Sequence, residues 1–183
     1  MRGKSHVKSV YSIFHTAAGW VGILSSPAGI KRVTLPQKSE DEAREALGSG
    51  PVQAAPADGG LNDLIAQFRG YYSGRRVVIT GSPDLSAATP FQRDVWQAAR
   101  LIPYGETRSY RWVAEKIGKP GAARAVGQAL GKNPCPVIVP CHRVLNNNGG
   151  LGGFSGGIEM KKQLLKLEGA PISRGKTGAA AKA

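Results

Sequence analysis

The segment from Asn133 to Gly157, NPCPVIVPCHRVLNNNGGLGGFSGG, constrains the fold more than any other part of the chain. It contains three prolines and six glycines, and neither residue type is favoured inside a long helix or a central strand. The apolar run VIV between Pro136 and Pro140 predicts a short buried strand bounded by its prolines. Cys141 then lies where this rigid strand ends, a place that suits a side chain that must be held still.

Four interpretations of Cys141 are open from the residues alone. It is an inert core residue, a metal ligand with Cys135 and His142, a disulfide partner of Cys135, or a nucleophile with a base beside it. A metal site would lack a fourth ligand at a standard spacing, and a reducing compartment disfavours a disulfide. In a regular strand His142 would point to the opposite face, so its contact with the thiol needs a turn or a bridging water. The loop 149–157 can fold over the strand end, where Ser155 offers donors to a ligand.

Residues 1–88 are predicted to form a small α/β domain. The pattern of apolar residues and turns predicts strands over 10–24, 28–35 and 75–79 and helices over 39–47 and 61–74, the first of these helices with Ser39 as its N-cap. A flexible connection is expected at 48–60, where glycine, proline and alanine dominate. We expect no residue of this half to carry chemistry, because His6 and His15 have no partner motif.

From Thr89 onward the apolar spacing becomes helical. Helices are predicted over 89–102, 109–118 and 122–131. Thr89 can cap the first of them, whose first position suits Pro90, and Ser109 can cap the second. The second and third helices are short and are separated by the tight turn KPG, which is typical of a helix-turn-helix.

The third helix has an outer face of small residues. Its Val126, Ala129 and Leu130 can pack inward, which leaves outside the residues Ala123, Arg124, Gly127 and Gln128. One interpretation is close packing against another helix inside the domain. The other is a helix that faces nucleic acid, whose Arg124 reaches between base steps.

The charge of the chain favours a polyanionic partner. Its net charge is +13, and residues 89–173 hold twelve Lys and Arg against five Asp and Glu. Nucleic acid fits better than a membrane, because no basic amphipathic helix stands out and no run of 18 apolar residues exists. No apolar segment of a secretory signal follows the basic N-terminus. Two cysteines form no disulfide framework, so we expect a reducing, cytoplasmic environment.

The motifs together resemble one known family. NPCPVIVPCHRV, preceded by AARAVG and followed by FSGG and LEG, is similar to the O6-alkylguanine-DNA alkyltransferases. The similarity runs from about Thr89 to Gly169 without a gap and extends weakly over TAAGWVG and AGIKRVTLP. It implies irreversible, single-turnover transfer of an alkyl group, such as methyl, from guanine O6 in double-stranded DNA to a cysteine. O4-alkylthymine is a second candidate substrate.

The resemblance also assigns the residues of the reaction. It implies that Cys141 accepts the alkyl group, that His142 is the base acting through a water, and that Glu168 orients this histidine. Asn133 corresponds to the hinge between recognition helix and active site. Tyr110 corresponds to the tyrosine that handles the backbone phosphate and helps to protonate the leaving guanine.

The remaining assignments concern DNA and the substrate pocket. Arg124 corresponds to the arginine that fills the space of the extruded nucleotide, on a helix whose DNA-facing surface includes Ala123 and Gly127. The pocket positions are Val144, Phe154, Ser155 and Lys161. Phe154 stands where many relatives carry Tyr. The resemblance implies no cofactor and no metal, since the cysteines of the family's N-terminal zinc site are missing before Cys135.

The fold implied by the resemblance is α/β with two domains. An N-terminal ribonuclease H-like domain would span 1–88, a mostly helical, winged-helix-like domain with the helix-turn-helix 89–173, and a flexible basic tail 174–183. We expect a monomer that binds damaged DNA and no membrane. The main alternative is a protein that binds alkylated DNA without reacting with it, and the presence of Cys141 argues against this alternative.

Overall fold

The computed structural model describes residues 9–48, 53–54 and 60–172. Its first part is a four-stranded sheet of β1 (Val10–Thr16), β2 (Gly19–Ser26), β3 (Gly29–Val33) and β4 (Gln53–Ala54), in the order β3-β2-β1-β4. The predicted strand 10–24 is therefore two strands, because the chain turns at Ala17 and Ala18, and Gly19 takes a φ of 130° that favours glycine. β4 lies in the predicted connection and pairs in parallel with β1. His6 and the tail 174–183 lie outside the described residues.

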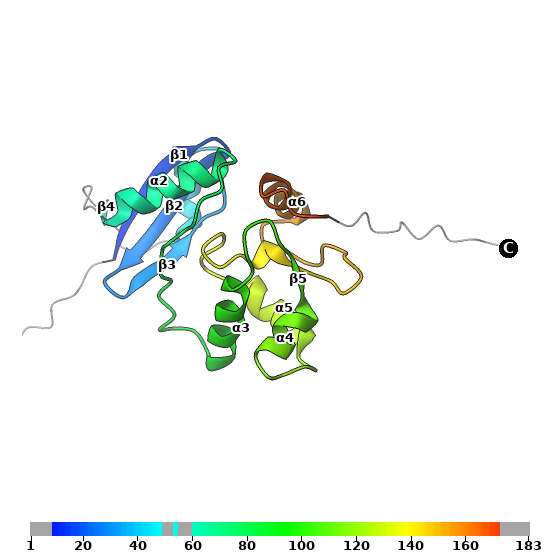
Figure 1. Cartoon of the computed structure of the whole chain (residues 1–183). Coiled ribbons are helices and arrows are strands. Elements are labelled where there is room, and N and C mark those ends of the chain that lie inside the picture. The colour runs from blue at the N-terminus through cyan, green and yellow to red at the C-terminus, as the bar shows by residue number, and fades with distance from the viewer. Residues whose placement is uncertain (1–8, 49–52, 55–59, 173–183) are drawn as a thin grey trace, which may run out of the picture.

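Two helices accompany this sheet. α1 (Glu40–Ala46) begins at Ser39, whose side chain accepts from the amide of Glu42, as the sequence predicts. α2 (Gly60–Tyr72) lies along one face of the sheet and buries its apolar side against it (Figure 1). The predicted strand 75–79 is wrong. This segment forms no ladder, and Val78, a residue the prediction needed in a sheet, is 79% exposed.

The second part is mostly helical (Figure 1), and its segment 134–138 contacts the sheet. Its helices are α3 (Pro90–Arg100), α4 (Tyr110–Lys116), α5 (Ala123–Gly131) and α6 (Ile158–Leu167). Thr89 and Ser109 cap α3 and α4 through their hydroxyls, as predicted. β5 (Arg108–Ser109) pairs in parallel with β6 (Val144–Leu145). No helix in the described part of the chain is long and apolar enough to cross a bilayer.

The run VIV is a turn, so the predicted buried strand is also wrong. The amide of Val139 donates to the carbonyl of Cys135 at 2.8 Å, and Val137 has a φ of 73°, rare for a β-branched residue. Three residues between prolines are too few to build a ladder, since a proline offers no amide hydrogen to a neighbouring strand. After Pro140 the chain enters a short 3-10 helix, η1 (Cys141–Arg143).

This turn is shared by two hydrophobic cores. One core lies among α3, α4 and α5 and includes Val139 and Cys141. The other lies between the sheet and α2 and includes Cys135, Val137 and Ile138. Apolar side chains of one short segment are therefore buried on both sides of it, and this burial holds η1 in place.

Candidate active site

A pocket of about 530 Å³ opens between α5, the start of α4 and the loop that follows β6. Seven of the predicted site residues line it: Tyr110, Ala123, Arg124, Gly127, Cys141, Phe154 and Ser155. The other five, Asn133, His142, Val144, Lys161 and Glu168, do not line it. They are linked to it through the contacts described below.

Cys141 is held by the residue that precedes the turn. Asn133 Nδ2 donates to Cys141 Sγ at 3.2 Å and to the carbonyl of Val139 at 2.9 Å, while Asn133 Oδ1 accepts from the amide of Cys135 at 3.0 Å. The thiol is 5% exposed. Burial raises the pKa of Cys141, and the hydrogen bond from Asn133 and the charge of Lys161 oppose this rise. The free protein therefore keeps a protonated thiol that needs a base.

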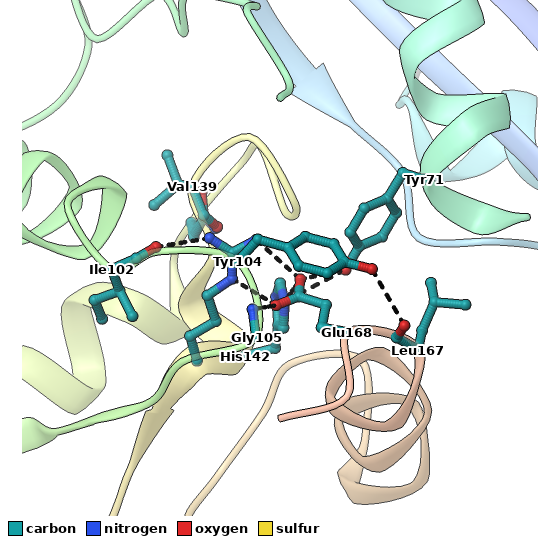
Figure 2. Close-up of polar contacts among 10 residues, drawn as sticks. Tyr71, Ile102, Tyr104, Gly105, Val139, His142, Leu167 and Glu168 are labelled. Atoms are coloured by element: carbon teal, nitrogen blue, oxygen red, sulfur yellow. Dashed lines mark hydrogen bonds and ion pairs between the residues drawn. The ribbon is translucent and has the colours of Figure 1, made fainter. Parts of the chain in front are cut away.

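His142 lies next to that thiol in η1 and is fully buried. Its Nε2 is 2.7 Å from Glu168 Oε1 (Figure 2). Because a carboxylate can only accept, Nε2 carries the proton and Nδ1 carries a lone pair. Nδ1 has no hydrogen-bond partner among the described residues. Burial lowers the pKa of His142 although Glu168 opposes the shift, so the ring is neutral and ready to accept a proton.

Glu168 at the end of α6 is itself fixed from several sides. Arg143 donates to both carboxylate oxygens, from Nε to Oε2 at 2.8 Å and from Nη2 to Oε1 at 2.9 Å. Its Nη1 donates to the carbonyl of Ile102. The amide of Gly105 adds a hydrogen bond at 3.2 Å. Burial would raise the pKa of Glu168, but the hydrogen bonds from His142 and Arg143 hold it at about 2. Glu168 is therefore an anion at neutral pH.

A residue of the first half completes this cluster. Tyr71, from α2, donates to Glu168 Oε1 at 2.7 Å and lies 3.4 Å from His142 Nε2 (Figure 2). A residue from 1–88, the half for which the sequence predicts no chemistry, therefore contacts two of the predicted site residues. His15, by contrast, is exposed and packs edge-on against Trp20, away from this cluster.

Lys161 holds the glycine-rich loop 149–157 in place beside the site through hydrogen bonds. Its ammonium group donates to the carbonyls of Val144, at 2.6 Å, and of Leu151 and Gly153. Burial lowers the pKa of Lys161 to about 8. The same ammonium group lies 5.7 Å from the centre of the Tyr110 ring. Tyr110 in turn donates to the carbonyl of Gly153, so Lys161 supports from behind a pocket wall that is made of Tyr110 and the loop.

The small-residue face of α5 forms the mouth of the pocket. Arg124 and Gln128 are exposed, and Ala123 and Gly127 are half-buried. The inner residues Val126, Ala129 and Leu130 lie in the core, as the spacing predicts. Gly127 lies against the ring of Tyr110, while Arg124 and Gln128 remain exposed, so this side of α5 is open at the mouth of the pocket. Phe154 closes the pocket and contacts both cores, and Ser155 is exposed beside it.

The sequence missed two residues of this cluster, Tyr71 and Arg143. Arg143 stood inside the motif PCHRV, and a charged residue between a buried histidine and a buried valine could have signalled an ion pair. Tyr71 carried no comparable signal, because its partner Glu168 is ninety-seven residues away in the sequence. Both cysteines are free and buried, and the described residues hold no group of three or more potential metal ligands.

The chain is similar to known repair proteins. Residues 90–170 match the family model described as 6-O-methylguanine DNA methyltransferase, DNA binding domain. The methylated-DNA–protein-cysteine methyltransferase of Mycolicibacterium paratuberculosis is 41% identical over 155 residues, which cover 85% of this chain and 91% of that protein. The chain belongs to the methylated-DNA–protein-cysteine methyltransferase family. The Shigella flexneri member is 46% identical over 116 residues, 63% of this chain and 66% of that protein.

Solved structures of methyltransferases agree with this membership. The structure of Mycobacterium tuberculosis OGT in complex with DNA has a TM-score of 0.71 and 36% identity, and covers 88% of this chain and 94% of that one. The O6-methylguanine-DNA methyltransferase of Pyrococcus kodakaraensis has a TM-score of 0.60 and 26% identity, and covers 88% of this chain and 99% of that one. This member of the family thus shares the α/β architecture of its relatives.

Proposed function

We propose that this protein repairs O6-alkylguanine in double-stranded DNA by moving the alkyl group irreversibly to Cys141. The observation that carries the proposal is the arrangement around this thiol. Cys141 lies in a pocket large enough for a purine, and next to it a neutral histidine with one free nitrogen is held by an ionised carboxylate. A thiol buried for packing alone would need neither the pocket nor the base.

The proposed reaction begins with the removal of the proton from the Cys141 thiol. The lone pair of His142 Nδ1 takes the thiol proton through one bridging water, and Glu168 stabilises the imidazolium that forms. The thiolate attacks the alkyl carbon, a C–S bond forms, and the C–O6 bond breaks. Its electron pair passes to the purine, which takes up a proton with the help of Tyr110. The thioether product has no leaving group to return, so each molecule acts once.

The proposed substrate must leave the base stack first, because guanine O6 is not accessible to a buried thiol in an intact duplex. We assign to Arg124, at the exposed mouth of the pocket, the filling of the vacated space. The small side of α5 at Ala123 and Gly127 lets the helix approach the DNA backbone closely. We assign the remaining pocket positions to Val144, Phe154, Ser155 and Lys161. Phe154 and Ser155 line the pocket, Ser155 through main-chain groups, and Lys161 supports it from behind through its hydrogen bond to the main-chain carbonyl of Val144.

We also propose the finer description of the fold. An N-terminal ribonuclease H-like domain would span 1–88, and a winged-helix-like domain with α4 and α5 as its helix-turn-helix would span 89–173. The protein would act as a monomer in the cytoplasm, associated with the nucleoid through DNA. Two separate cores support two domains, although Cys135, Val137, Ile138 and Leu164 of the second half complete the core of the first.

The test is to weigh the intact protein after incubation with a duplex that carries one O6-methylguanine. The wild type should gain one methyl group in place of a hydrogen, stoichiometrically, and peptide mapping should find it on Cys141. Cys141→Ala should gain nothing and still bind the duplex. Methylation of Cys135, which is also buried and free, would refute the assignment, and binding without any mass gain in the wild type would identify a lesion-binding protein.

A further inference from the structure

We propose that Tyr71 is a positioning residue for this reaction and that it sets, through Glu168, the pH at which His142 can act as a base. The inference rests on the proposed function. It adds a residue from the other half of the chain to the machinery, and it gives the contact between α2 and α6 a chemical purpose in addition to a structural one.

The geometry of one oxygen carries the argument. Glu168 Oε1 accepts from Tyr71 at 2.7 Å, from His142 Nε2 at 2.7 Å and from Arg143 Nη2 at 2.9 Å. Donors that share an acceptor oxygen compete for the same negative charge, so each donor weakens the hydrogen bonds that the other donors make to that oxygen. The hydroxyl of Tyr71 therefore limits how strongly Glu168 favours protonated His142.

Tyr71 is built to hold its position. It is 1% exposed, and its ring packs edge-on against Tyr72, at 5.2 Å between ring centres, and against Tyr104, at 6.2 Å. Burial and the neighbouring Glu168 raise the pKa of Tyr71 far above its usual value, so its hydroxyl remains a donor at every working pH. Nothing but Glu168 and His142 takes part in hydrogen bonds with this hydroxyl among the described residues.

The charged groups around His142 determine how its pKa responds when the hydroxyl of Tyr71 is removed. The titratable and charged groups that act on the histidine or on its carboxylate partner are Tyr71, Tyr104, Arg143, Lys161 and Glu168. Removing the hydroxyl of Tyr71 leaves these charges unchanged. Glu168 then accepts one hydrogen bond fewer, so it stabilises protonated His142 more strongly. The pKa of His142 should then rise. Because only neutral His142 accepts a proton, the reaction should fail at a higher pH than in the wild type.

The experiment compares two phenylalanine variants that differ by one position. Tyr71→Phe removes a hydroxyl bonded to Glu168, whereas Tyr72→Phe removes one that is buried and has no partner among the described residues. The rate of methyl transfer from an O6-methylguanine duplex is measured from about pH 5 to about pH 9, the range in which histidine titrates. In Tyr71→Phe the midpoint of the acid limb should move up by about half a pH unit or more. Tyr72→Phe should keep the wild-type midpoint.

A second measurement does not depend on the reaction. In a Cys141→Ser background, the pKa of His142 is followed by NMR with and without Tyr71→Phe, and it should rise by the same amount. An unmoved acid limb and an unmoved histidine titration would overturn the inference, even if the variant were slower at every pH. A wild type that takes up no methyl group would contradict the proposed function instead, and the NMR titration would still test the link between Tyr71 and His142.

Discussion

Five hydrogen bonds end on the carboxylate of Glu168, from His142, Tyr71, Gly105 and twice from Arg143. Such a dense set fixes both oxygens in space and leaves no freedom for the imidazole to turn. A buried carboxylate with a single partner would be costly, since desolvation exceeds the attraction of one pair. Burial of the Glu168 carboxylate is tolerated here because every lone pair that loses its hydrogen bond to water gains a donor from the protein.

Glu168→Gln should slow alkyl transfer by at least about tenfold, since the amide cannot stabilise a protonated His142. Affinity for DNA should change little, because Glu168 is buried and does not line the pocket. Single-turnover kinetics and a binding titration on the same duplex separate the two effects. Glu159→Gln, an exposed change on the same helix, is the matched control, and wild-type speed in Glu168→Gln would remove this carboxylate from the mechanism.

The same residue should govern stability in acid. The pKa of Glu168 lies at about 2 in the folded protein, below its ordinary value of 4.5. The folded state therefore gains stability from this group above pH 4.5 and loses it as the pH falls towards 2. The difference corresponds to roughly 3 kcal/mol. Urea unfolding at several pH values should show this loss in the wild type. Glu168→Gln, already less stable at neutral pH, should lack that part of the slope, and parallel slopes would contradict the prediction.

At the scale of single residues, sequence patterns found what local motifs encode. Cys141, His142 and Asn133 lie in one continuous segment, and the structure brings them together by a turn within that segment. Tyr71 could not be found, because its role depends on how α2 packs against α6 and not on its neighbours in the chain. A tyrosine beside apolar residues at helical spacing looks the same whether its hydroxyl has a buried partner or none, as Tyr72 shows.

At the scale of elements, the capping residues predicted helices correctly, whereas the short apolar runs VIV and RRVVI predicted strands that do not form. Ser39, Thr89 and Ser109 all accept the hydrogen bonds that their positions predict. VIV and RRVVI are rich in β-branched residues, but neither has a neighbouring strand with free amides and carbonyls to pair with. Propensity for a strand has no effect without a partner, and the partner is decided by the whole fold.

Arg124 on α5 belongs to this scale, because its position depends on the helix that carries it. Arg124→Ala should slow repair of O6-methylguanine in duplex DNA far more than reaction with the free O6-alkylguanine base. Only the duplex contains a vacated stack that needs filling. Both rates are measured on one preparation, with Lys116→Ala on α4, outside the pocket lining, as a control for lost positive charge. Equal losses on both substrates would place Arg124 in the chemistry or in the fold.

At the scale of the whole molecule, the pocket and the two cores are coupled through Asn133. Its side chain touches the sulfur of Cys141, the carbonyl of Val139 and the amide of Cys135. These last two residues belong to different cores. A change at the sulfur therefore reaches both halves through one amide group.

Methylation of Cys141 should consequently lower the melting temperature of the protein. Methylation enlarges a side chain that is only 5% exposed. Overpacking a core typically costs about 1–3 kcal/mol, and the thioether is a poorer acceptor for Asn133. Against a total stability of about 5–15 kcal/mol this is a large fraction. Calorimetry and limited proteolysis compare free and methylated protein, and cleavage should increase between residues 122 and 157. Superimposable melting curves and digests would mean that the pocket accommodates the methyl group without affecting α5.

The hydrogen bond between Tyr71 and Glu168 also bears on the stage of folding at which the protein becomes reactive. It joins positions ninety-seven residues apart, and Cys135 reaches the carbonyl of Ile30 across a separation of one hundred and five. Contacts that close such long loops form late, because the entropy of closure must be lost before they contribute. The hairpin β1–β2 and the capped helices need no such closure. A chain that is still folding therefore has its thiol before it has the buried imidazole and carboxylate that activate it, so alkyl transfer by this relay begins only once the long-range contacts have closed.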